Sequence, residues 1–276
     1  MTIGSPEAQA VLTRGIVQML RNAGITVPAE LANEVKLINS LQILRDKRQT
    51  KKQNTLDSLL SISASDFESG LEKAYEVWTE ESPESEFEGK VNTVLNQRIV
   101  GALYSAHGRI LGDITDKMNQ VVTDFQLNEV QLPSSLLGDF NYMRASRAEV
   151  EAISAFRDAA PVLDSLWRPY KAVATPLGHD LAGIEYSSAL DLVFMLSDVD
   201  NFYDAQVLAQ GFNTLRMNMD SMKHIQGLGL WGVIHLSGHR IEIRSIAEAQ
   251  FRRGEIQNAP APQPVATHRA AGFMLA

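Results

Sequence analysis

Large apolar residues recur every three or four positions through most of the chain, which is the spacing of an amphipathic helix. The pattern predicts a helix from Pro6 to Ala23, ended by Gly24, and a second helix that opens at Pro28. Proline is favoured at the first helical position and glycine just past the last, so both boundaries agree with the pattern. We therefore expect a mainly α fold in which several helices form a bundle.

The longest periodic stretch runs from Val91 to Phe125 and predicts a long central helix. Gly108 and Gly112 lie four residues apart in it, on one helical face. Each glycine costs up to about 1 kcal/mol relative to alanine in a helix. Either the close approach of a second helix or a kink would account for that cost.

Further helices are indicated by caps and by renewed periodicity. Residues 146–149 form a capping-box pattern, and Pro161 is expected to end or kink the helix that follows. Two more helices are predicted, one over residues 189–196 and one from Phe202 to about residue 225. Asp200 is the expected N-cap of the last of these.

A strand pattern appears late, in residues 230–245. An apolar-rich run, 230–236, and a run in which Ile241 and Ile243 alternate with charged residues, 239–245, flank Ser237-Gly238. Two residues of this type between two strands favour a tight β-hairpin. Since an isolated hairpin is marginal in water, we expect it to pack on helices or to extend another sheet.

Two charged tracts break the apolar pattern near the N-terminal end. Residues 45–54 contain no apolar residue and five basic ones: Arg45, Lys47, Arg48, Lys51 and Lys52. Short charge runs are typical of a solvated helix extension or connection. The alternative is a contact site for phosphates or an acidic partner, including nucleic acid, although no aromatic residue for base stacking is interleaved.

An acidic tract follows, and we interpret residues 81–90 as a solvated linker loop. Its carboxylates could instead pair with the basic tract of a neighbouring subunit. The expected organisation is a helical unit over residues 1–80, this linker, and a main helical domain over residues 91–256 that contains the hairpin. A Pro-rich C-terminal arm over residues 257–276 follows the main domain.

The arm suggests docking. Alternating prolines favour an extended segment, and the apolar residues Phe273, Met274 and Leu275 stand at its end. Burial of these apolar side chains against another surface would be favourable. These three residues are therefore the candidate partner-binding residues. The other interpretation is an idle terminal tail.

Composition narrows the chemistry. The 276 residues carry a net charge of −8 and no cysteine, which excludes thiolate catalysis and cysteine-held metals. We find no glycine-rich phosphate loop, no serine-hydrolase elbow, no secretory signal and no membrane span, and we expect no cofactor. His179-Asp180 is similar to the paired metal ligands of HD-type phosphohydrolases, but a two-residue match arises often by chance, and we assign no metal or catalytic residue.

The sequence therefore favours a non-catalytic structural or assembly protein that forms homo-oligomers or joins a larger particle. Components of virus and phage particles often combine these traits, an analogy of architecture only. A nucleic-acid-associated module that uses the basic tract is one alternative, and a helical metal-dependent phosphohydrolase centred on His179 and Asp180 is another. We expect the protein in the cytoplasm or within an assembled particle, with no membrane partner.

Overall fold

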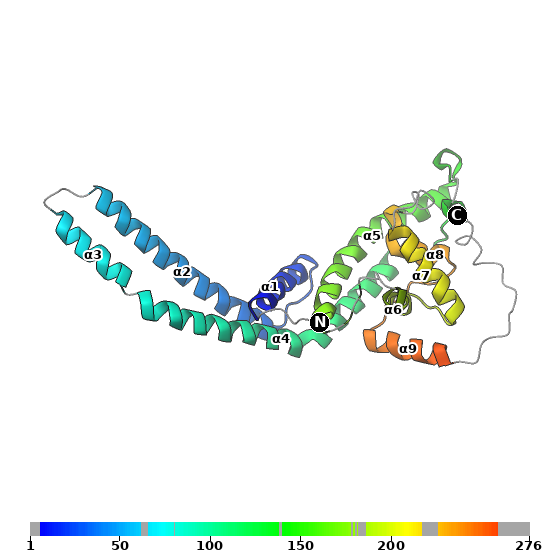
Figure 1. The fold of residues 1–276 in the computed structure, drawn as a ribbon. Helices are drawn as coiled ribbons and strands as arrows, with labels where there is room; N and C mark the ends of the chain where they lie inside the picture. Colours follow the sequence, from blue (N-terminus) through cyan, green and yellow to red (C-terminus); the bar gives the residue numbers. More distant parts are fainter. Residues whose placement is uncertain are drawn as a thin grey trace. The chain divides into compact units, whose positions relative to one another are not determined.

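The computed structural model of the chain consists mostly of helices, so the predicted mainly α class is confirmed (Figure 1). It describes residues 6–61, 66–79, 81–137, 140–177, 179, 181, 186–216 and 226–258. The chain forms two compact units, Met1–His107 and Gly108–Ala276, and the boundary between them lies inside a single long helix.

The first unit contains α1 (Pro6–Asn22), α2 (Ala29–Ser61), α3 (Phe67–Thr79) and the first part of α4 (Glu81–Asp124). Helices α2 and α3 lie side by side and run in opposite directions (Figure 1). Apolar side chains are buried at the beginning of the unit, among them Ile16, Leu20 and Leu31. The part of α2 beyond Leu41 buries far less of its surface.

The predicted end of the first helix at Gly24 is confirmed. Gly24 has a φ of +65°, and its N–H donates to the carbonyl oxygen of Arg21 at 3.0 Å. The N–H of Ile25 donates to the carbonyl oxygen of Leu20 at 2.9 Å. This pair of bonds satisfies the last carbonyls of α1, and its left-handed position is one that glycine occupies without strain.

The long central helix is confirmed as α4, but it begins earlier than predicted. Residues 81–90, which we expected to form a solvated loop, are the first part of α4. Glutamate is a good helix former, and Pro83 falls in the first turn, where its missing N–H has no acceptor within the helix. The acidic composition therefore describes a helix rather than a linker loop.

The close helix approach that we considered for Gly108 and Gly112 is wrong for the described part of the chain. Both glycines are exposed, and no described atom outside their own helical backbone lies within 4 Å of a Cβ placed at either position.

The second unit contains the rest of α4, then α5 (Arg147–Ala174), α6 (Tyr186–Leu196), α7 (Phe202–Arg216), α8 (Gly229–Leu236) and α9 (Ile246–Asn258). Short 3₁₀ turns lie at Ser134–Leu137, Tyr142–Arg144, Thr175–Leu177 and Gln226–Leu228. Helix α6 contacts α7 and α9, and α8 contacts α5 and α7. The side chains of Met118, Phe156, Tyr170, Phe194 and Trp231 are fully buried.

Two helix boundaries in this unit differ from the prediction. The capping box at Ser146 and Glu149 is confirmed. Of the two outcomes expected at Pro161, a helix end is wrong, because α5 continues as far as Ala174. The N-cap of α7 is Asn201 rather than Asp200, because the Asn201 side-chain oxygen accepts the N–H of Asp204 at 2.9 Å. Residues 217–225, where we expected this helix to continue, lie outside the described residues.

The predicted β-hairpin is wrong. Residues 229–236 form α8, and Gly238, with a φ of +84°, ends it by the same pair of bonds that ends α1. A hairpin turn and a helix end both favour a left-handed glycine, so Gly238 fits either. Residues 231–234 are all buried, and such a short apolar run has no periodicity that separates helix from strand.

Candidate functional site

All five residues of the basic tract lie in α2, which confirms the solvated helix extension. Arg45 Nε donates to Glu88 Oε2 of α4 at 3.3 Å, and Arg48 forms an ion pair with the same carboxylate. Lys47 and Lys51 are exposed and form no ion pair within the described residues. The tract is therefore divided between side chains that hold α4 and side chains that face solvent.

A third ion pair also joins α2 to α4. Arg98 Nη2 donates to Glu34 Oε1 at 2.7 Å. Together with the Glu88 pairs, it aligns the two helices in an antiparallel register. The arginine side chains of these ion pairs are 35–55% exposed to solvent. Solvent-exposed ion pairs each contribute about 1 kcal/mol to stability at most. Glu88, which we considered as a partner for a neighbouring subunit, is engaged within its own chain.

The candidate docking tip, Phe273, Met274 and Leu275, lies outside the described residues, and so does Asp180. His179 is half-buried, and its backbone N–H donates to the carbonyl oxygen of Ala174 at 3.3 Å. Among the residues that the structure describes, no three His, Cys, Asp or Glu side chains gather in a way that could hold a metal ion. Nor does any described helix have the length and apolar character needed to cross a bilayer.

An extended segment, residues 239–245, follows α8 and lies against the end of α6. The N–H of Glu242 donates to the carbonyl oxygen of Leu196 at 3.1 Å, and the N–H of Arg244 donates to that of Met195 at 2.9 Å. Ile241 forms an antiparallel bridge with Ser197. The second run of the predicted hairpin is therefore extended, but its partner is the end of a helix.

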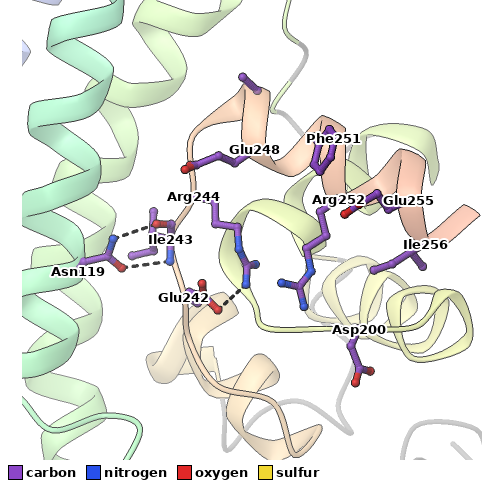
Figure 2. A pocket seen from close by; sticks show the side chains of 11 residues that line it. Asn119, Asp200, Glu242, Ile243, Arg244, Glu248, Phe251, Arg252, Glu255 and Ile256 are labelled. Atoms are coloured by element: carbon purple, nitrogen blue, oxygen red, sulfur yellow. Dashed lines mark hydrogen bonds and ion pairs between the residues drawn. The ribbon is translucent and has the colours of Figure 1, made fainter.

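Two asparagines hold the other edge of this segment. The Asn119 side chain bonds both the N–H and the carbonyl oxygen of Ile243, at 3.1 and 2.9 Å (Figure 2). Asn128 does the same for Ile241, at 2.8 and 2.9 Å. Each amide pairs with the segment as a neighbouring strand would, so backbone groups that would otherwise lack partners are satisfied.

Sequence reasoning missed both asparagines. The alternating Ile241 and Ile243 correctly indicated an extended segment, but isolated asparagines in a helix and in a loop carry no pattern that names their partner. Their separation from the segment by more than 110 residues removed any local signal.

Two arginines bind backbone carbonyls around the end of α6. Arg244 donates to the carbonyl oxygens of Phe194 and Ser197, and it forms an ion pair with Glu242. Arg252 donates to the carbonyl oxygens of Val199 and Asp198 at 2.9 and 2.8 Å. Cations are favourable at a helix C-terminus. Burial lowers the pKa of Arg244, and the Glu242 carboxylate opposes that effect. Because both arginines bind backbone carbonyls, they stabilise the fold around the end of α6.

The extended segment and α9 line an open depression of about 920 Å³. Figure 2 shows the side chains that line it. Phe251 projects from α9 with 69% of its surface exposed. Glu248 lies at the first turn, where the hydroxyl and N–H of Ser245 donate to its carboxylate and lower its pKa. The arginines of the depression already bond carbonyls, so this surface offers contact area rather than a converging set of reactive groups.

No family model, no curated protein and no solved structure matches this chain.

Proposed function

We propose that this chain is a non-catalytic assembly protein that forms homo-oligomers or joins a larger particle, as virion components do. The supporting observation is the surface of α2 and α3. Ile43 and Leu44 on α2 are 54% and 53% exposed, and Leu71 and Tyr75 on α3 are 51% and 71% exposed. We propose that these exposed apolar side chains of α2 and α3 are buried in contacts with another subunit.

The Pro-rich arm is the second part of the proposal. Burial of its tip, Phe273 to Leu275, is favourable by about 25 cal/mol per Å² of apolar surface removed from water. We propose that it docks on another subunit. Deletion of residues 259–276 should leave the helical content unchanged and reduce the native mass measured by size-exclusion chromatography with light scattering. An unchanged native mass would remove the arm from the proposal.

Nucleic-acid binding through α2 is the second candidate. The exposed Lys47 and Lys51 favour it, whereas the engagement of Arg45 and Arg48 by Glu88 and the net charge of −8 oppose it. Phosphate contacts release counterions, so any binding of a DNA or RNA duplex should weaken steeply with salt. Fluorescence anisotropy with a labelled duplex tests this, and binding lost in Lys47→Ala/Lys51→Ala would favour the second candidate over the first.

A further inference from the structure

One side of α3 combines exposed apolar and acidic side chains. Glu68, Leu71, Glu72 and Tyr75 are spaced three or four residues apart, so they share one helical face. Ala74, which is buried, marks a different side of the helix. Glu68 and Glu72 form no ion pair within the described residues. We call these four residues the acidic face.

One side of α2 has the corresponding composition with the opposite charge. Leu44, Lys47 and Lys51 are spaced three and four residues apart and are all exposed. The intrachain pairs with Glu88 use Arg45 and Arg48 instead. We call Leu44, Lys47 and Lys51 the basic face.

The two faces match when their helices are aligned antiparallel. Glu68 then falls opposite Lys51, Glu72 opposite Lys47, and Tyr75 opposite Leu44, because one step forward on α3 corresponds to one step back on α2. Each acidic position meets a basic one, and apolar side chains meet at the end of the contact. An antiparallel helix pair also places opposite macrodipole ends next to each other.

Resting on the assembly function proposed above, we propose that the acidic face of one copy binds the basic face of a second copy. Within one chain, α2 and α3 already contact each other while both faces stay exposed. Every copy carries both faces, so the occupant that fits the charge pattern is this chain itself. Opposite charges across an interface select the partner and its register, and like charges there reject it.

Charge reversal in the full-length protein tests the contact. Lys47→Glu/Lys51→Glu places acidic residues on both faces, and Glu68→Lys/Glu72→Lys places basic residues on both. We expect the self-association constant of each variant alone, measured by analytical ultracentrifugation at low salt, to fall by about tenfold or more. An equimolar mixture of the two variants should associate again, and so should a chain that carries all four changes.

The matched control is Glu129→Lys/Asp158→Lys, which changes the net charge by the same amount as Glu68→Lys/Glu72→Lys at exposed positions of the second unit. It should associate like the unaltered chain, and circular dichroism should show equal helical content in all variants. Equal weakening in the control, or no recovery in the mixture, would overturn the proposed contact. If the unaltered chain assembles and no reversal alters its mass, this contact is wrong while the assembly function stands. A chain that stays monomeric throughout would contradict both.

Discussion

Gly108 and Gly112 should be sites where alanine stabilises the protein. Both lie in α4 and are exposed, and a Cβ added at either would meet open space. Glycine within a helix costs about 0.8–1.0 kcal/mol relative to alanine, because the unfolded chain loses more conformational freedom on folding. The variant Gly108→Ala/Gly112→Ala should therefore gain about 2 kcal/mol in free energy of unfolding.

Gly232 provides the contrasting control within the same unit. A Cβ at Gly232 would lie 2.5 Å from the Cβ of Leu228 and 3.2 Å from its Cδ1. Overpacking of this kind typically costs about 1–3 kcal/mol, which outweighs the gain in helix propensity. Gly232→Ala should therefore be destabilised.

Urea unfolding followed by circular dichroism measures both effects. For a unit of this size, the gain at Gly108 and Gly112 should also appear as a rise in Tm of about 4–8 °C. A loss of stability in the double alanine variant would refute the reasoning, since it would mean that another chain approaches these glycines closely. A drop in native mass together with that loss would place a subunit contact there.

Three further outcomes follow from the second unit. Asn119→Ala should lower the free energy of unfolding by about 1–3 kcal/mol in urea titrations, because it leaves the N–H and carbonyl of Ile243 without partners; an unchanged midpoint would contradict the strand-like role of the amide. Ser146→Ala removes the cap of α5 and should cost about 1 kcal/mol in the same assay, whereas no loss would contradict the capping box. Burial lowers the pKa of His235, so the unfolded chain takes up this proton first as the pH falls. The contribution of neutral His235 to stability is therefore fully present above pH ~6.5 and is lost as the pH falls below that value. Between pH 7.5 and 5.5, thermal melts should show a smaller drop in Tm for His235→Gln than for the unaltered chain. Equal drops would contradict this assignment.

The sequence predicted the elements whose signals are local. The stop at Gly24, the capping box at Ser146 and the long periodic helix depend on residues within a few turns of one another, so their patterns could be recognised. The hairpin failed because Gly238 and the apolar run before it suit a strand turn and a buried helix equally well. In that case tertiary packing, not local preference, decided the structure.

The candidate surfaces were only partly accessible to sequence reasoning. The basic tract was recognisable as a run of charges, but which members face solvent depended on Glu88, which lies some 40 residues away and pairs with Arg45 and Arg48. The asparagines that hold residues 241 and 243 were not recognisable, because their partners are backbone groups of a distant segment.

Sedimentation of the full-length chain over a wide range of concentration, at low and then at high salt, tests self-association most directly. We predict a mass above that of one 30.4 kDa chain that rises with concentration and decreases when salt is added. A single 30.4 kDa species at every concentration and at both salt levels would contradict the proposal that this chain builds assemblies from copies of itself.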